Sequence, residues 1–314
     1  MPKHEIAIFL ESKIPCFSFK QRHLERMKCE LPYAIPAWCR NRTDFLSALP
    51  HARTALTWTF EQEWFDIAPE LCKIGTPAAG RDFFHVTSVP PHIEIRNGTF
   101  HGSVIAETAL GMLLAVNRGI LKAFRHQLNG ELWPAEYLFD SRLIYDSHAV
   151  IIGFGHIGSH IGHRLKSFGV HITGIKRNAD VIPPDWFGKD DSIRPPEDLH
   201  PVLSKADHVI AVLPSDTATD GVLGRQEFEI MPSHAVVYNF GRGNCIDEKA
   251  LAYALRNGVI AGACLDVFAR EPLSADSPLA DKNLPGLLRM PHSSAFCDSY
   301  IDCFLDEFTE WIKN

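Results

Sequence analysis

The chain has 314 residues, more than double the usual domain size of roughly 100–150 residues, so two domains are expected. Its 46% hydrophobic and 22% charged residues are typical of a globular protein and exclude extended disorder. Lysine and arginine together number 31 and aspartate and glutamate 38, which gives a net charge of −7. This mildly acidic balance argues against general binding to nucleic acid or to anionic membranes.

The eight cysteines are scattered along the chain and form neither a C-x-x-C pair nor the spacing of a zinc site. That distribution predicts reduced thiols, no bound metal and a cytoplasmic location. The first residues become charged too early for the core of a signal peptide. The most apolar stretch, residues 104–116, is interrupted by Glu107, so no membrane span is expected.

Short apolar runs alternate with polar helical stretches over the first hundred residues, a pattern typical of a parallel α/β layer. The pattern predicts a helix at residues 19–29 and strands at residues 5–10, 54–59, 71–74 and 83–86. A long helical pattern then predicts one helix over residues 103–127, with Ser103 as its N-cap. A loop or arm that carries Trp133-Pro134 is expected over residues 129–147.

From residue 148 the periodicity becomes regular. It predicts strands at residues 149–152, 171–175, 208–213, 235–239, 261–267 and 287–290, and helices at 156–168, 197–205, 225–230, 247–257 and 298–311. Residues 182–196 read as a proline-rich linker, while Asp247 and Gly258 suit the two ends of their helix. Six strands with helical crossovers indicate a doubly wound parallel sheet.

The segment Gly153-Phe154-Gly155-His156-Ile157-Gly158 follows a predicted strand and opens a predicted helix. Glycines in this context permit a tight turn and a close approach to a pyrophosphate, which the free N–H groups of the helix would bind. The alternative is a glycine turn that only packs a helix on a strand. The surrounding six-strand pattern favours dinucleotide binding.

The end of the second strand of such a sheet distinguishes NAD from NADP. An acidic residue there would bind the ribose 2′-hydroxyl of NAD, but this chain has Lys176 and Arg177. Two cations would bind a 2′-phosphate through charge-assisted hydrogen bonds, so NADP is expected as the preferred cofactor and NAD as the alternative. The competing interpretation is a solvated pair of loop charges.

Three chemically useful side chains follow the last three predicted strands, namely Arg242, Glu271 and His292. Ligands of open parallel sheets bind outside the carboxyl ends of the strands, so these residues are expected to converge on one edge. Hydride transfer to a carbonyl needs a proton donor, which His292 can supply with Glu271 orienting it. Arg242 can hold a carboxylate. Taken singly, each has an ordinary explanation as a loop, turn or surface residue.

Several segments occur in a characteristic order over residues 79–294. They are Ala79-Gly80-Arg81-Asp82, Ser103-Val104-Ile105-Ala106-Glu107, the glycine motif at 153–158, Leu213-Pro214 with Thr219-x-Gly221, Asn239-Phe240-Gly241-Arg242-Gly243, Asp266-Val267-Phe268-x-x-Glu271-Pro272-Leu273 and Pro291-His292. With these segments the chain resembles the D-isomer-specific 2-hydroxyacid dehydrogenase family.

The resemblance implies a Rossmann-type, doubly wound cofactor domain (residues 103–290) inserted into a smaller flavodoxin-like α/β substrate domain (residues 1–102, with 291–314 returning to it). It implies an oxidoreductase that transfers a hydride between NADPH, or NADH, and a small 2-oxo or 2-hydroxy acid such as glyoxylate, hydroxypyruvate or a related D-2-hydroxy acid. Family members are commonly homodimers with the region after Ser103 at the contact.

The resemblance also implies roles for single residues. Arg242 would bind the substrate carboxylate, Glu271 would support the histidine, and His292 would be the acid or base. The backbone amides of Ala79 and Gly80 would help to hold the substrate carboxylate. The implied cofactor contacts are Gly153, Gly155, His156, Ile157 and Gly158 at the pyrophosphate, Lys176 and Arg177 at the ribose, Leu213, Pro214, Thr219, Phe240 and Gly241 along the cleft, and Asp266 at the nicotinamide carboxamide.

Three features depart from the family pattern: the cations at Lys176-Arg177, the serines Ser293-Ser294 after the histidine, and residues 141–147, which lack the usual glycine-lysine pair before the glycine motif. A second interpretation is a dinucleotide-sensing, corepressor-like interaction protein that uses the same fold with little turnover. The presence of Arg242, Glu271 and His292 together argues for an enzyme. Formate or phosphite oxidation is a weaker third reading, because formate enzymes lack the carboxylate that Glu271 supplies.

Overall fold

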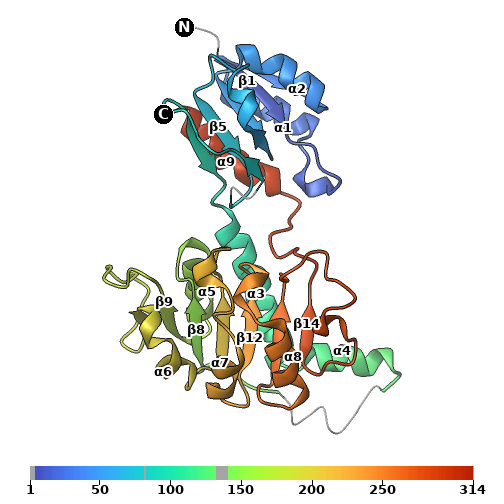
Figure 1. Ribbon diagram of the computed structural model, residues 1–314, viewed down its shortest axis with the longest axis vertical. Helices are drawn as coiled ribbons and strands as arrows, with labels where there is room; N and C mark the ends of the chain where they lie inside the picture. Colours follow the sequence, from blue (N-terminus) through green and yellow to red (C-terminus); the bar gives the residue numbers. More distant parts are fainter. Residues whose placement is uncertain (1–3, 81–82, 132–140, 314) are drawn as a thin grey trace. The chain divides into compact units, whose positions relative to one another are not determined.

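The computed structural model describes residues 4–80, 83–131 and 141–313. The chain divides into two compact units, unit 1 with Met1–His101 and Phe296–Asn314, and unit 2 with Gly102–Ala295 (Figure 1). The sequence pattern places the two junctions after residues 102 and 290, against 101 and 295 in the structure. Arg81-Asp82 and Trp133-Pro134, singled out above, lie outside the described residues.

Unit 1 is built on a five-stranded parallel sheet with the order β2-β1-β3-β5-β7. Its strands are β1 (His4–Phe9), β2 (Ala34–Trp38), β3 (Thr54–Thr57), β5 (Lys73–Thr76) and β7 (Glu94–Asn97), and its helices are α1 (Gln21–Glu30), α2 (Arg42–Ala48) and α9 (Tyr300–Lys313). Numbered along the sheet's own strands, this is the 2-1-3-4-5 order of flavodoxin-like folds. The predicted α/β class is confirmed.

Three elements of unit 1 escape the sequence pattern. Strand β2 lies at the sheet edge, where Pro36 is tolerated because its missing N–H faces outward, and β7 forms the other edge with an alternating, polar sequence. Helix α2 begins where the Asn41 side chain accepts a hydrogen bond from the Asp44 N–H, at 2.9 Å. The strand expected at residues 83–86 is only the two-residue β6 (Phe84–His85), which pairs with β4 (Phe60–Glu61) outside the main sheet.

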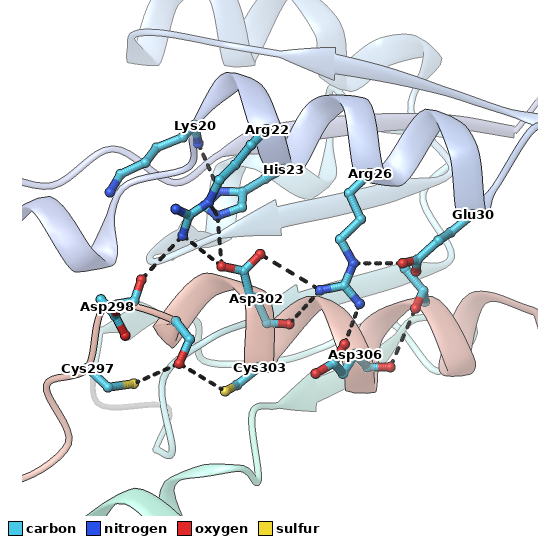
Figure 2. A network of polar contacts seen from close by, with 12 residues as sticks. Lys20, Arg22, His23, Arg26, Glu30, Cys297, Asp298, Asp302, Cys303 and Asp306 are labelled. Atoms are coloured by element: carbon cyan, nitrogen blue, oxygen red, sulfur yellow. Dashed lines mark hydrogen bonds and ion pairs between the residues drawn. The ribbon is translucent and has the colours of Figure 1, made fainter.

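The C-terminal helix α9 is held in unit 1 by an apolar stripe and a polar network. The Phe304 and Phe308 rings of α9 pack against Gly75 of β5. A Cβ on Gly75 would lie 3.3 Å from each ring, so the glycine allows β5 and α9 to come this close. Figure 2 shows the polar side, where Arg22 donates to the Asp302 carboxylate at 2.7 Å and Arg26 bridges Glu30 and Asp306. The contacts with Asp302 and Asp306 join residues 280 positions apart, so the chain ends return to one unit.

Unit 2 contains a seven-stranded parallel sheet with the order β10-β9-β8-β11-β12-β13-β14. The strands are β8 (His148–Ile152), β9 (His171–Ile175), β10 (Ser192–Arg194), β11 (His208–Ala211), β12 (Val236–Asn239), β13 (Gly262–Leu265) and β14 (Leu287–Arg289). This is the 3-2-1-4-5-6 Rossmann order with one further strand. The prediction missed β10, because it lies in the proline-rich stretch expected as a linker.

Successive residues of these strands enter two different cores, one on each face of the sheet. Val150 and Ile152 of β8 pack with the helices α6 (Leu199–Leu203), α7 (Arg225–Ile230) and α8 (Glu248–Arg256). Ala149 and Ile151 pack with α3 (His101–Asn117) and α5 (His156–Lys166). Burial on both faces explains why the strands read as continuous apolar runs. The helix ends expected at Asp247 and Gly258 are confirmed.

The single helix expected over residues 103–127 is wrong. The structure has α3 (His101–Asn117) and α4 (Ile120–Leu128), separated at Gly119, whose φ of 67° lies in the left-handed region that ends a helix. Ser103 lies inside α3 and is not its N-cap. Within the described part of the chain no single helix is long and apolar enough to cross a membrane; α3 and α4 pass that test only as a pair bent by 66°.

The buried His208 makes the stability of unit 2 depend on pH. It is 2% exposed, both ring nitrogens lack a hydrogen-bond partner in the described structure, and burial lowers its pKa to about 4. Between pH 6.5 and 4 the unfolded chain therefore binds a proton that the folded chain does not. The free energy of unfolding thus decreases as the pH is lowered. We expect the free energy of urea unfolding to fall by about 2 kcal/mol more for the wild type than for His208→Asn between pH 7.5 and 5. Parallel pH slopes would contradict this.

Candidate functional site

The glycine motif forms the turn between β8 and α5. Gly153 has a φ of 94°, and a Cβ there would lie 2.4 Å from the carbonyl oxygen of Val212, so no other residue fits the position. Gly155 is the N-cap of α5, and a Cβ built on it would have no neighbour within 4 Å. The N–H groups of the first turn have no acceptor within the helix, which leaves them available to an anion.

The turn therefore suits the pyrophosphate of a dinucleotide. His156, Ile157 and Gly158 begin the eleven-residue helix α5 at this point, and its positive dipole end adds to the attraction. Ile157 packs partly against the core, whereas His156 is exposed beside the turn. An open, donor-rich turn at a helix N-terminus fits a bound pyrophosphate; the role of each residue in binding stays a prediction.

Lys176 and Arg177 lie at the carboxyl end of β9, with Lys176 half-buried and Arg177 exposed. The Lys176 N–H donates to the Arg194 carbonyl at 3.0 Å, which brings Arg194 at the end of β10 beside them. Sequence reasoning missed this third cation, because β10 was not expected. The ends of β9 and β10 thus carry three cationic residues, of which Arg194 is ion-paired with Asp198 at 3.9 Å.

The loops after β11 and β12 lie very close together and position Arg242. A Cβ on Gly241 would lie 2.5 Å from the Leu213 N–H nitrogen, and one on Gly243 would lie 1.8 Å from the Phe268 carbonyl carbon. The two glycines beside Arg242 are therefore required by packing. Arg242 itself is half-buried and donates to the Gly241 carbonyl at 3.0 Å.

Two predicted cofactor residues have other contacts in the structure. The Thr219 hydroxyl bonds within its own loop, donating to the Pro214 carbonyl at 2.8 Å. Phe240 is 4% exposed and packs in the core on the α3 side of the sheet, so any contact it makes with a cofactor comes from its backbone. Their parts in cofactor binding, like those of Leu213, Pro214 and Gly241, stay predictions.

His292 and Glu271 form a direct pair. Their Nδ1 and Oε2 atoms are 2.7 Å apart, and the other Glu271 oxygen accepts the Phe268 N–H at 3.0 Å. Because a carboxylate only accepts hydrogen bonds, Nδ1 carries the proton of this contact and Nε2 is left for another molecule. Half of the His292 side chain is exposed, so a ligand can reach it.

A cavity of about 570 Å³ lies beside this pair. Its lining is mostly apolar and comprises Phe268, Glu271, Pro272, Leu273, Arg289, Met290, Pro291 and His292. Apolar walls with a few convergent polar groups are typical of small-molecule sites. No group of three or more histidine, cysteine or acidic side chains placed to bind a metal occurs in the described ranges.

Asp266, predicted to contact the nicotinamide carboxamide, binds the loop after His292 in the structure, and its part in cofactor binding stays a prediction. Its side chain is buried, and its two oxygens accept the N–H groups of Ser293 and Ser294 at 2.7 and 3.0 Å. Asn239 likewise binds the loop of Arg242. Its side-chain amide donates a hydrogen bond to the Arg242 carbonyl oxygen at 3.0 Å. The sequence indicated Asn239 only as part of a motif.

Ala79 and Gly80 belong to unit 1, in the loop that follows β5. Asn97 at the end of β7 donates to the carbonyls of Ala78 and Gly80, at 3.2 and 2.8 Å, and so shapes this loop. Asn97 was not predicted from the sequence. The part of Ala79 and Gly80 in substrate binding stays a prediction.

Comparison with known proteins gives the same indication as the geometry. Residues 110–294 match the family model described as the NAD binding domain of D-isomer specific 2-hydroxyacid dehydrogenases. A D-3-phosphoglycerate dehydrogenase of Methanocaldococcus jannaschii is 31% identical over 230 residues, which cover 73% of this chain and 42% of the relative. The chain thus matches less than half of that relative's length.

Two further comparisons cover more of both chains. Glyoxylate/hydroxypyruvate reductase B of Pectobacterium carotovorum is 30% identical over 237 residues, or 74% of this chain and 72% of the relative. The crystal structure of a D-isomer specific 2-hydroxyacid dehydrogenase family protein from Aeromonas salmonicida has a TM-score of 0.76 and 27% identity, and covers 99% of this chain and 96% of its own.

Proposed function

The chain belongs to the D-isomer specific 2-hydroxyacid dehydrogenase family, and from this premise we propose that it reduces a small 2-oxo acid to the corresponding 2-hydroxy acid (the D-isomer where the product is chiral), with NADPH preferred over NADH. Members of this family are oxidoreductases, and the matched domain binds a nicotinamide dinucleotide. The observation that carries the proposal is the 2.7 Å contact of His292 with Glu271 at the sheet edge that also bears Arg242. Glyoxylate and hydroxypyruvate are the candidate substrates, in keeping with the name of the Pectobacterium relative.

The proposed reaction needs one proton and one hydride for each carbonyl reduced. The nicotinamide, when bound, supplies the hydride. His292 donates the proton from Nε2 to the oxygen that becomes the hydroxyl group, and Glu271 keeps the ring in the required orientation and stabilises its charged form. Arg242 binds the substrate carboxylate with its planar fork and draws electron density from the neighbouring carbonyl.

A substrate panel tests the proposed function. Glyoxylate, hydroxypyruvate, pyruvate and longer 2-oxo acids are each supplied with NADPH and with NADH, and absorbance at the nicotinamide band is followed. We expect steady turnover of at least one small 2-oxo acid, faster at equal concentration with NADPH. Tight NADPH binding without turnover of any acid would instead support the dinucleotide-sensing alternative.

The cations at the ends of β9 and β10 support the proposed NADPH preference. Charge-assisted hydrogen bonds contribute roughly 1.5–3 kcal/mol each, so removing two of them has a large effect. We expect Lys176→Ala with Arg177→Ala to raise KM for NADPH roughly 100-fold or more and to leave KM for NADH nearly unchanged. Lys205→Ala removes an exposed cation before β11 and is the control. An equal rise for both cofactors would contradict the preference.

We also propose a homodimer with α4 at the contact. Ile120, Phe124 and Leu128 recur every four residues on one face of α4 and are 54%, 57% and 70% exposed. Such a stripe indicates a surface that another chain covers. Light scattering should give twice the 35.2 kDa chain mass for the wild type and the single mass for Phe124→Glu. Gln226→Glu places the same charge on the exposed face of another helix, α7, and should stay dimeric; a monomeric wild type would refute the proposal.

A further inference from the structure

His292 has an unusual backbone conformation. Its φ is 52°, and only one other non-glycine residue in the described chain, Asp146, has a positive φ. This left-handed region is unfavourable for a residue with a β-carbon and persists only where the surroundings hold it. Something near His292 must therefore fix the loop that carries it.

Asp266 provides three hydrogen bonds to that loop. Its backbone carbonyl accepts the His292 N–H at 2.8 Å, and its carboxylate oxygens accept the next two N–H groups, those of Ser293 and Ser294. Asp266 is 1% exposed, so these bonds are shielded from water. Three successive N–H groups bound by one residue determine the direction in which the His292 side chain leaves the backbone.

Asn239 holds the loop of Arg242 in a similar way. Its side-chain amide donates to the Arg242 carbonyl, and its side-chain oxygen accepts the Gly241 N–H, both at 3.0 Å. The Asn239 side chain is fully buried at the end of β12. Its backbone carbonyl also accepts the Asp266 N–H at 3.0 Å, so the two residues are themselves bonded.

We propose that Asp266 and Asn239 are a pair of positioning residues, which act on the reaction through His292 and Arg242 respectively. The network runs without interruption from the Arg242 loop through Asn239 and Asp266 to the His292 loop. It aligns the proton donor and the carboxylate-binding guanidinium on one sheet edge, which is what a precise reaction geometry requires. This inference rests on the proposed roles of His292 and Arg242.

The positioning role of Asp266 can be separated from a contact with the nicotinamide carboxamide. In Asp266→Asn one acceptor oxygen becomes an amide that faces an N–H donor, so the His292 loop loses a bond. We expect kcat to fall at least 30-fold, and by the same factor with the 3-acetylpyridine analogue of NADPH, which has no carboxamide N–H. A loss confined to NADPH itself would show that Asp266 acts on the cofactor and would overturn the proposal.

A double-mutant cycle tests whether Asp266 acts through the histidine. In the His292→Asn background, Asp266→Asn should cause no further loss of kcat. Asn239→Asp is the matched exchange at the Arg242 loop. The carboxylate still accepts the Gly241 N–H, but the side-chain amide that donated to the Arg242 carbonyl is replaced by an oxygen that cannot donate. We expect it to raise KM for the 2-oxo acid at least tenfold with the cofactor Kd unchanged. Additive losses in the cycle, or an unchanged KM, would overturn the pairing.

Amide hydrogen exchange of the wild type gives a test that needs neither turnover nor a folded variant. If Asp266 holds the loop, the Ser293 and Ser294 N–H groups should exchange at least 100-fold more slowly than unprotected amides, although the neighbouring His292 is exposed. Exchange at the unprotected rate would overturn the proposal. If no 2-oxo acid is turned over, the proposed function fails, and the exchange rates still decide whether the loop is held.

Discussion

His292→Asn is expected to lower kcat by a factor of roughly 100–10,000, the usual contribution of a positioned general acid. Asparagine cannot deliver a proton to the developing hydroxyl group, while the cofactor turn at Gly153 lies on other strands and is not altered. The Kd for NADPH, measured by nicotinamide fluorescence, should therefore stay within about twofold of the wild type while kcat falls.

The chain offers a matched control for this variant. His234 forms a similar pair with Asp207, whose Oδ1 lies 2.7 Å from its Nε2, but at the amino ends of the strands. His234→Asn should leave kcat unchanged. Near-wild-type turnover by His292→Asn would remove the histidine from the mechanism, and an equal loss in both variants would indicate a general effect on folding.

Arg242→Ala should reduce kcat/KM for the 2-oxo acid by roughly 100- to 10,000-fold, since two charged hydrogen bonds of about 1.5–3 kcal/mol each are lost. Both constants should change, because in the proposed mechanism the guanidinium holds the carboxylate in the ground state and polarises the carbonyl in the transition state. Arg242→Lys should recover only part of this loss, because an ammonium lacks the planar fork.

The measurement is a full kinetic profile of each variant with saturating NADPH. Arg256→Ala, which removes an exposed arginine paired with Asp281 at 3.1 Å, is the control and should behave as the wild type. A normal KM in Arg242→Ala would show that the substrate carboxylate binds elsewhere, for example at the unit 1 loop of Ala79 and Gly80. A normal kcat with a raised KM would limit Arg242 to binding.

Much of unit 2 could be predicted, because its signals are local. Buried parallel strands read as apolar runs, the turn at Gly153 needs a glycine for its backbone, and Asp247 and Gly258 frame α8 through their own neighbours. Edge strands such as β2 and β10 lack these signals. They are short, contain or adjoin proline, and are defined by the strand beside them.

The sequence by itself determined the two α/β layers, the dinucleotide turn and the three residue types proposed for the chemistry, since each depends on side chains close together along the chain. The tertiary structure alone decided that the Arg194 carbonyl binds the Lys176 N–H, that α3 ends before Gly119 and that Asp266 and Asn239 bind the loops of His292 and Arg242. Those contacts arise from the register of neighbouring strands and from close loop packing, and residues far apart in the chain carry no local pattern that specifies them.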